Sequence, residues 1–176
     1  KYEALFMKGH NRLLGFARRA CDDYNMISPG DTVAVGLSGG KDSLALLYTM
    51  AALRRFYPVP FRLIAVTIDM RFDEIGKSAA DFGPIQKLCR ELDVEYHIEP
   101  SNIAKIVFDI RKESNPCSLC AKLRRGMLCD TAKKLGANKI ALGHHFDDAV
   151  QTFMLNLFYE GRLGCFSPVT YLDRSD

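Results

Sequence analysis

The stretch Ser-Gly-Gly-Lys-Asp-Ser at residues 38–43 constrains the fold of this chain more than any other part of it. It joins an apolar run at residues 32–37 to a helical pattern that begins at Leu44. Two adjacent glycines let the backbone approach a ligand closely, and the start of a helix directs N–H groups and the positive end of its dipole into the turn. Lys41 adds a full positive charge. The sequence therefore predicts an anion-binding turn between a buried strand and a helix.

The loop at residues 38–43 differs from a Walker A loop. A Walker A loop has a glycine five residues before the glycine of its Gly-Lys pair and a Ser or Thr after the lysine; here Val35 and Asp42 occupy those places. An ordinary strand-to-helix turn is the alternative, but the full string favours a nucleotide site. The string resembles the PP-loop of the ATP pyrophosphatase superfamily. That resemblance implies cleavage of ATP between the α and β phosphates to leave an adenylate.

Composition is typical of a soluble globular protein with one full core. The chain has 176 residues, of which 48% are hydrophobic and 26% charged, and no apolar run approaches the roughly 20 residues of a membrane span. Six cysteines beside a nucleotide loop favour a reducing compartment with metal or sulfur chemistry over disulfides. We therefore expect a cytoplasmic protein. The net charge of +3 does not by itself indicate a nucleic-acid binder.

Apolar runs alternate with helical patterns along the chain, which predicts an α/β fold with a doubly wound parallel sheet, Rossmann-like, after an N-terminal helix. We expect an N-terminal extension at residues 1–30 and a PP-loop domain at residues 31–176. The predicted strands are residues 32–37, 61–69, 94–98 and 139–142. The predicted helices are residues 2–24, 42–57, 84–92, 101–112 and 119–135, and one after residue 148. A loop is predicted at residues 70–83 and a turn at residues 115–117.

Two histidines and two carboxylates lie close together in the string Gly-His-His-Phe-Asp-Asp at residues 143–148. One interpretation is structural, with Asp147 as the N-cap of the helix that follows. The other is that these carboxylates hold Mg²⁺ opposite a triphosphate, since Mg²⁺ prefers one or two carboxylates together with phosphate oxygens and water.

Cys117 and Cys120 form a CxxC pair with basic residues just downstream. Two thiols at this spacing can share a metal. Zinc needs four ligands and the chain has no second CxxC pair, so a zinc site is the weaker interpretation. We expect Cys129 in the core. The remaining cysteines are expected as small buried side chains or surface thiols: Cys21, Cys89 and Cys165.

Three separated motifs narrow the resemblance. They are Pro-Cys-Ser-Leu-Cys at residues 116–120 continuing to Leu-Arg-Arg-Gly at residues 123–126, Ala-Leu-Gly-His-His at residues 141–145, and the pair Asp147 and Asp148. Together they are similar to the TtcA family of tRNA 2-thiocytidine synthetases, over nearly the whole chain. The resemblance implies adenylation of the C2 oxygen of an anticodon-loop cytidine and its replacement by sulfur.

In this family the CxxC pair and a third, later cysteine hold a [4Fe-4S] cluster whose remaining iron can carry sulfur, so the resemblance implies that cofactor. The sequence departs from the pattern because it stops at Asp176, before the region of the third cysteine. Cys165 is a weak substitute. Without a third thiolate, Cys117 and Cys120 could instead act as a persulfide-carrying pair.

The resemblance also implies the site residues. The residues expected to bind ATP are Ser38, Gly39, Gly40, Lys41, Asp42, Ser43, Val66, Ile68, Asp69, Gly143 and His144. The residues expected to act in catalysis are Asp42, Cys117, Cys120, Arg124 and Asp147, with Asp147 on Mg²⁺ and the two cysteines on the cluster.

The expected partners are tRNA and a sulfur donor, either sulfide or the persulfide of a cysteine desulfurase, with no membrane; a homodimer is compatible with this interpretation. A basic footprint for RNA could come from two helices, and its candidates are Arg12, Arg18, Arg19, Lys122, Arg124, Arg125, Lys133 and Lys134. Two alternatives stay open. One is an amidating PP-loop synthetase, or another tRNA thiolase; the other is a nucleotide-binding module without catalysis.

Overall fold

The structure is a computed structural model that describes residues 2–76, 78–111 and 116–171, with side chains from residue 9 onward. The chain forms two compact units. The sheet unit comprises residues 28–142, and the helical unit comprises residues 1–27 and 143–176. Each is described by itself.

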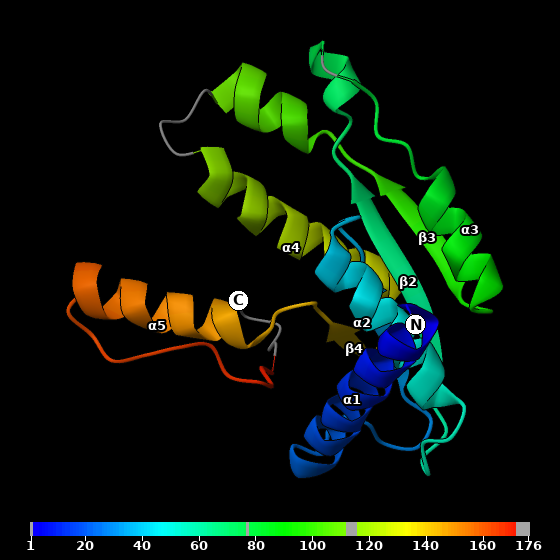
Figure 1. Cartoon of the computed structure of the whole chain (residues 1–176). Coiled ribbons are helices and arrows are strands. Elements are labelled where there is room, and N and C mark those ends of the chain that lie inside the picture. The colour runs from blue at the N-terminus through cyan, green and yellow to red at the C-terminus, as the bar shows by residue number, and fades with distance from the viewer. Residues whose placement is uncertain (1, 77, 112–115, 172–176) are drawn as a thin grey trace. The chain divides into compact units, whose positions relative to one another are not determined.

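The sheet unit is built on a four-stranded parallel sheet (Figure 1). The strand order is β3-β2-β1-β4, so the first two strands occupy the centre. Central parallel strands are buried on both faces and read as continuous apolar runs, and residues 33–35 and 63–67 are all buried. The predicted α/β class and parallel sheet are confirmed. The strands are β1 Thr32–Gly36, β2 Arg62–Asp69, β3 Glu95–Pro100 and β4 Lys139–Ala141.

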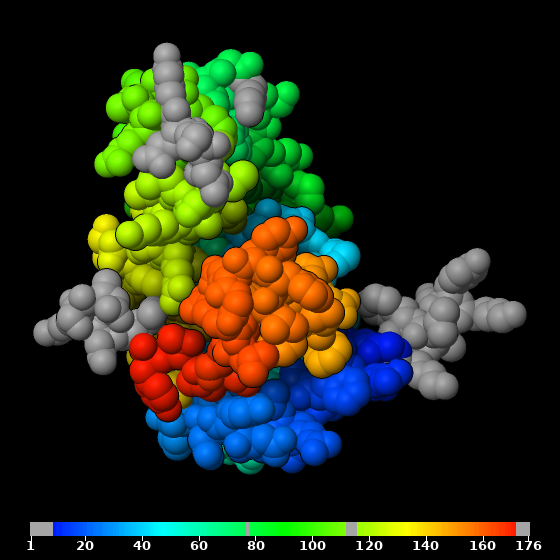
Figure 2. All heavy atoms as spheres, turned by 90° about the vertical axis from the view of Figure 1, so that its left-hand side faces the viewer, coloured from blue at the N-terminus to red at the C-terminus, as the bar shows by residue number. Residues whose placement is uncertain are grey.

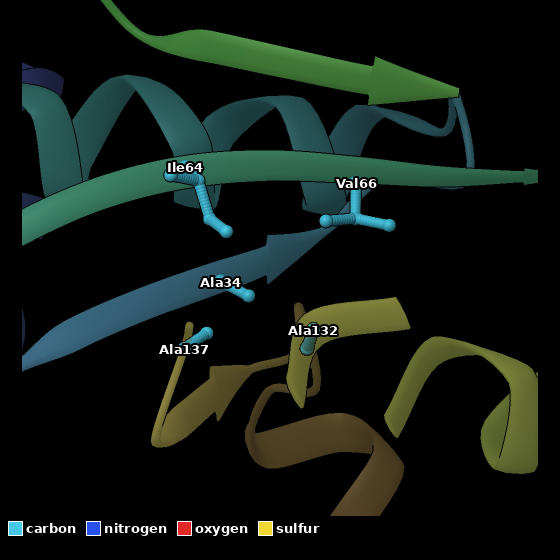
Figure 3. Close-up of a cluster of buried hydrophobic side chains, with 5 residues drawn as sticks. All are labelled: Ala34, Ile64, Val66, Ala132 and Ala137. Carbon is cyan, nitrogen blue, oxygen red and sulfur yellow. The ribbon is translucent and has the colours of Figure 1, made fainter. Parts of the chain in front are cut away.

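Helices cover both faces of this sheet, as the doubly wound fold requires. Helices α2 (Lys41–Arg54) and α3 (Gly83–Glu91) follow β1 and β2 and cover one face, and α4 (Pro116–Lys134) covers the other (Figures 1 and 3). Three alanines let α4 and the turn after it come close to the sheet. The cluster on this face consists of Ala34, Ile64, Val66, Ala132 and Ala137 (Figure 3).

The order in which strands are added to the sheet changes side at β1. Because β2 and β3 continue to one side of β1 while β4 lies on the other, the carboxyl end of β1 is the topological switch point. Open α/β sheets bind ligands in the crevice at this point. The loop at residues 38–43 begins there.

Four predicted elements differ in detail from the structure. Helix α2 ends at Arg54, before residue 57, and the predicted loop at residues 70–83 contains a 3₁₀ helix, η1 (Phe72–Ile75). The helix predicted at residues 101–112 is a π-helix, η2 (Lys105–Arg111), for most of its length. The turn predicted at residues 115–117 is wrong for its described part, because α4 begins at Pro116, and proline suits the first position of a helix.

The helical unit contains α1 (Tyr2–Asp23) and α5 (Phe146–Tyr159). The segment after α5 runs back along that helix (Figures 1 and 2). It is held by a hydrogen bond of 2.9 Å from Asn156 Nδ2 to the Gly164 carbonyl and by a contact of 3.2 Å from Cys165 Sγ to the Ala149 carbonyl. Within the described ranges, no helix combines the length and the hydropathy that a membrane span requires.

Candidate functional site

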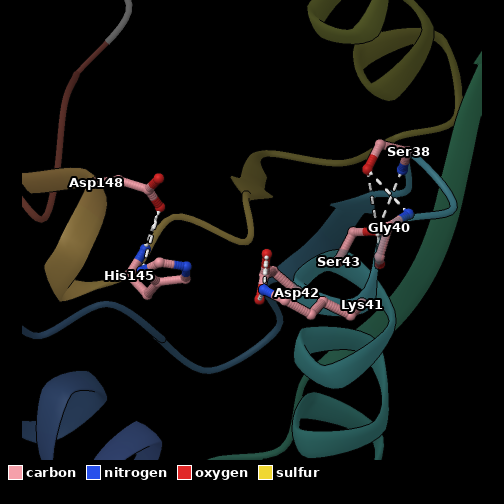
Figure 4. A network of polar contacts seen from close by, with 7 residues as sticks. All are labelled: Ser38, Gly40, Lys41, Asp42, Ser43, His145 and Asp148. Atoms are coloured by element: carbon pink, nitrogen blue, oxygen red, sulfur yellow. Dashed lines mark hydrogen bonds and ion pairs between the residues drawn. The ribbon is translucent and has the colours of Figure 1, made fainter. Parts of the chain in front are cut away.

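The loop at residues 38–43 has the predicted conformation of an anion cradle. Gly39 adopts φ +80°, which a side chain would disfavour, and Gly40 is the N-cap of α2. Ser43 donates to the Gly40 carbonyl over 2.9 Å, and the Gly40 amide donates to Ser38 Oγ over 3.3 Å (Figure 4). The first turn of α2 has no side-chain cap, which suits a helix start whose acceptor is a ligand.

Lys41 and Asp42 form an ion pair in this loop. Lys41 Nζ lies 2.8 Å from Asp42 Oδ1 and 2.9 Å from Oδ2 (Figure 4). The lysine side chain is 83% exposed and the carboxylate 44%, so both are open to solvent. A phosphate at the loop would compete with the carboxylate for the ammonium group, while a divalent cation would compete with the ammonium group for the carboxylate.

The end of β2 lies beside the loop, because the Leu37 amide donates to the Val66 carbonyl over 2.8 Å. Val66 itself is fully buried in the core cluster, whereas Ile68 and Asp69 are partly exposed. Asp69 fixes the backbone that follows the strand: its carboxylate accepts the Arg71 amide over 2.9 Å, and its carbonyl accepts Ser101 Oγ over 2.8 Å. Of the three residues on β2 that are expected to bind ATP, Ile68 and Asp69 therefore offer accessible side chains.

The CxxC pair occupies the start of α4. Cys117 is exposed and Cys120 is partly buried, and both are free thiols. Cys120 Sγ lies 3.7 Å from Met70 Sδ. Met70 directly follows β2, so this end of α4 reaches the carboxyl edge of the sheet. This contact could not be predicted from the sequence, since Met70 lies in a stretch without periodicity.

Arg124 lies on the face of α4 that carries Cys120. Residues four apart share a helix face, so Cys120, Arg124 and Leu128 form one row. Cys120 reaches Met70 at the end of β2, and Leu128 packs so closely on Gly36 at the end of β1 that a Cβ there would lie 2.8 Å from its Cδ2. Arg124 lies between these anchors, one turn or about 6 Å along the axis from each. Arg124 is exposed, and its helix position lies between the thiol-bearing first turn and the contact with Gly36.

A [4Fe-4S] cluster fits the described residues only in part. Cys117 and Cys120 can supply two of the cysteine thiolates that such clusters use. Within the described part of the chain, however, no group of three or more His, Cys, Asp or Glu side chains is close enough to hold a metal ion. The described residues thus provide two ligands and no third.

The string at residues 143–148 belongs to the helical unit. The N-cap of α5 is His145, and Asp148 Oδ2 accepts the His145 amide over 2.8 Å in a capping box (Figure 4). The structural interpretation of Asp147 as the N-cap is therefore wrong, because Asp148 has the i+3 spacing that the box needs. Asp147 is exposed, and His144 packs against Phe166 with ring centroids 5.4 Å apart and the ring planes tilted by 43°.

The other cysteines mostly lie where the sequence placed them. Cys21 and Cys89 are buried and Cys165 is exposed, while Cys129, expected in the core, is only partly buried. Burial raises the pKa of the Cys89 thiol to about 11, so this thiol is inert near neutral pH.

A carboxylate-imidazole pair on β3 escaped the sequence analysis. His97 Nε2 lies 2.9 Å from Glu99 Oε2, and both side chains are partly exposed. In the parallel register His97 pairs with Val66 and Glu99 with Ile68, so the pair lies on the same sheet face as those two residues. The signal was their spacing of two, which places both side chains on one face of a strand; the predicted strand, residues 94–98, ended one residue before Glu99, whereas the observed strand includes it.

Comparison with known proteins is consistent with this geometry. The family model described as "PP-loop domain" matches residues 15–167. Among curated proteins, the chain is 41% identical over 172 residues to a tRNA-cytidine(32) 2-sulfurtransferase of Ralstonia pickettii (strain 12J), covering 97% of this chain and 53% of that protein. It is 44% identical over 164 residues to a protein of the same name from Teredinibacter turnerae (strain ATCC 39867 / T7901), covering 93% and 53%. The chain thus spans about half the length of the curated relatives that it matches.

A solved structure has the same fold. The U34-tRNA thiolase NcsA from Methanococcus maripaludis, solved with its [4Fe-4S] cluster, aligns with a TM-score of 0.66 at 28% identity. The alignment covers 87% of this chain and 51% of that one.

Proposed function

Because the chain belongs to the PP-loop domain family, we propose that it is the ATP-binding part of a tRNA sulfurtransferase that converts cytidine 32 of tRNA into 2-thiocytidine. One observation carries the proposal: Cys120, Arg124 and Leu128 share one face of α4, and Leu128 packs against Gly36, two residues before the cradle. These contacts support a sulfur site and a phosphate cradle at the same edge of the sheet. An amidating synthetase has no use for the two thiols.

The first step adenylates the base. ATP lies with its phosphates in the cradle at residues 38–43 and its adenosine near Ile68 and Asp69. The C2 oxygen of cytidine attacks the α-phosphorus, the bond from that phosphorus to the bridging oxygen breaks, and pyrophosphate leaves with the electron pair. The amides of the cradle and Lys41 stabilise the charge that develops on the phosphates.

The second step replaces oxygen by sulfur. Hydrosulfide attacks C2, the bond from C2 to the adenylate oxygen breaks, and AMP leaves; with sulfide as the donor this step needs no oxidant or reductant. Cys117 and Cys120, at the start of α4, hold the incoming hydrosulfide through hydrogen bonds from their S–H groups. Arg124, between them and the cradle, stabilises the charge on the departing AMP as a bidentate donor to phosphate.

Magnesium would neutralise the leaving pyrophosphate, and its proposed carboxylate ligand in the sheet unit is Asp42. Asp147, with Gly143 and His144, remains a proposed participant on the basis of the sequence motif. A [4Fe-4S] cluster would need a third ligand besides Cys117 and Cys120, so no step of this proposal depends on it.

The test is an anaerobic reaction of the protein with ATP, Mg²⁺, sulfide and unmodified tRNA. We expect AMP and pyrophosphate in equal amounts and 2-thiocytidine in the nucleosides of the digested tRNA, measured by mass spectrometry. Lys41→Ala should abolish all three products, and Cys117→Ala should abolish the thiolated base. Pyrophosphate release that needs ammonia and survives Cys117→Ala would instead support an amidating synthetase. ATP binding without pyrophosphate release would support a binding module.

A further inference from the structure

Helix α4 concentrates positive charge. Its 19 residues include five basic side chains and one acidic side chain, a net charge of +4, whereas the whole chain carries +3. All five cations are exposed. They are Lys122, Arg124, Arg125, Lys133 and Lys134, and the single carboxylate is that of Asp130.

The cations of α4 are also unpaired. Within the described residues none of the five lies within 4.0 Å of a carboxylate oxygen, although many basic residues elsewhere do. The paired ones include Arg18, Arg19, Arg54, Arg62, Arg71, Lys87, Lys139 and Arg162. The positive charge of α4 therefore remains available to a ligand that the described part of the chain does not supply.

Three of these cations form a line. At 100° per residue, Lys122, Arg125 and Lys133 fall within about 80° of one another around the helix axis. They extend over eleven residues, or about 16 Å. Arg124 lies on the face toward the sheet edge, so the line is separate from the proposed catalytic face. Helix α4 forms part of the surface that Figure 2 shows.

A line of this length selects the kind of ligand. A single phosphate can contact one or two of these side chains, but not three spread over about 16 Å. A polyanion with regularly spaced charges can contact all of them, and a nucleic-acid backbone gains affinity from each such contact by counterion release. Lys122 lies nearest to the CxxC end of the helix.

We infer that Lys122, Arg125 and Lys133 bind backbone phosphates of the tRNA and guide its target base to the Cys117 end of α4. The inference rests on the proposed function, because that function makes tRNA the substrate. The three residues are positioning residues: they contact phosphates, and the chemistry takes place on the neighbouring face.

The test measures tRNA affinity of the whole chain against salt concentration. We compare the wild type with a triple variant, Lys122→Ala with Arg125→Ala and Lys133→Ala. A control triple variant, Arg62→Ala with Lys87→Ala and Arg162→Ala, removes the same charge from cations that are ion-paired. Each phosphate contact contributes about 0.7 to 0.9 to the slope of log affinity against log salt. We expect the α4 variant to lose about 2 from the slope and at least about tenfold in affinity at low salt.

The control variant should keep the wild-type slope, and both variants should bind ATP like the wild type in calorimetry, which also verifies their folding. Equal slopes in all three proteins would overturn the inference and leave the proposed function intact. An equal loss of slope and affinity in both variants would also overturn the inference. The same holds if the wild type binds polyglutamate as tightly as tRNA. Failure of the wild type to bind tRNA at all would instead overturn the proposed function.

Discussion

Cys120 and Met70 place their sulfur atoms 3.7 Å apart, although fifty residues separate them in the chain. Met70 is held at the end of β2 by its own backbone, since its carbonyl accepts the Ala104 amide over 3.3 Å. The contact thus fixes the start of α4 against the sheet edge. It also partly shields one thiol of the CxxC pair, while Cys117 stays exposed.

Removing the thioether should expose Cys120. We expect Met70→Ala to raise the alkylation rate of Cys120 by maleimide several-fold, because a flexible side chain no longer covers its sulfur. Met70→Leu, which keeps most of the volume, should give a rate near that of the wild type. The measurement is peptide mass spectrometry after timed labelling. Cys117 and the inert, buried Cys89 serve as internal references, and an unchanged Cys120 rate in Met70→Ala would show that the contact gives no protection.

Replacing glycine by alanine should have opposite effects on the free energy of unfolding at Gly36 and at Gly126. A Cβ on Gly36 would lie 2.8 Å from Leu128 Cδ2 and 2.9 Å from Leu142 Cδ2, while a Cβ on Gly126 would meet no atom within 4 Å. Gly36→Ala should therefore cost about 1–3 kcal/mol of unfolding free energy through overpacking. Gly126→Ala, on the exposed side of α4, should gain about 0.5–1 kcal/mol. Urea denaturation measures both, and a neutral Gly36→Ala would mean that the two leucines move aside freely.

The large features of the fold could be predicted because they follow from local patterns. Buried apolar runs predicted the parallel sheet, and the string at residues 38–43 predicted the cradle after β1. The features that escaped prediction depend on contacts between distant segments. The pairing of Met70 with Cys120 joins two stretches that show no sign of each other in sequence. His145 and Asp148 form the capping box of α5. Residue type alone does not tell which of the neighbouring carboxylates, Asp147 or Asp148, caps the helix, because the choice depends on hydrogen-bond geometry.

Asp31 should make stability depend on pH. Its carboxylate is buried, which raises its pKa, but Lys139, the Ser28 amide and Asn138 donate to it, and the net effect holds the pKa below the ordinary 3.8. A carboxyl group with a lowered folded pKa stabilises the fold above its ordinary pKa, and this contribution is lost as the pH falls through the folded value.

We expect Asp31→Asn to lower the free energy of unfolding at pH 7 by about 2 kcal/mol, since hydrogen bonds to a charged group contribute about 1.5–3 kcal/mol. Its deficit against the wild type should shrink as the pH falls below the ordinary pKa of Asp31. Urea denaturation from pH 7 downward measures this. Asp93→Asn, at an exposed carboxylate 3.8 Å from Arg54, is the control and should change little. A deficit that stays constant with pH would show that Asp31 acts by packing alone.

The ion pair between Lys41 and Asp42 predicts that the effect of Asp42→Asn on ATP affinity depends on magnesium. Without a divalent cation, Asp42 competes with ATP for the lysine, so Asp42→Asn should bind ATP at least as tightly as the wild type. With Mg²⁺, the wild type should gain affinity because the carboxylate turns to the metal, and Asp42→Asn should lack this gain.

Lys41→Ala should weaken binding about tenfold or more in both conditions, as expected for a lost hydrogen bond between charged groups. Calorimetry of these three proteins with and without Mg²⁺ measures all six combinations, with Lys87→Ala as the control. Equal magnesium dependence in the wild type and in Asp42→Asn would remove Asp42 from the metal site.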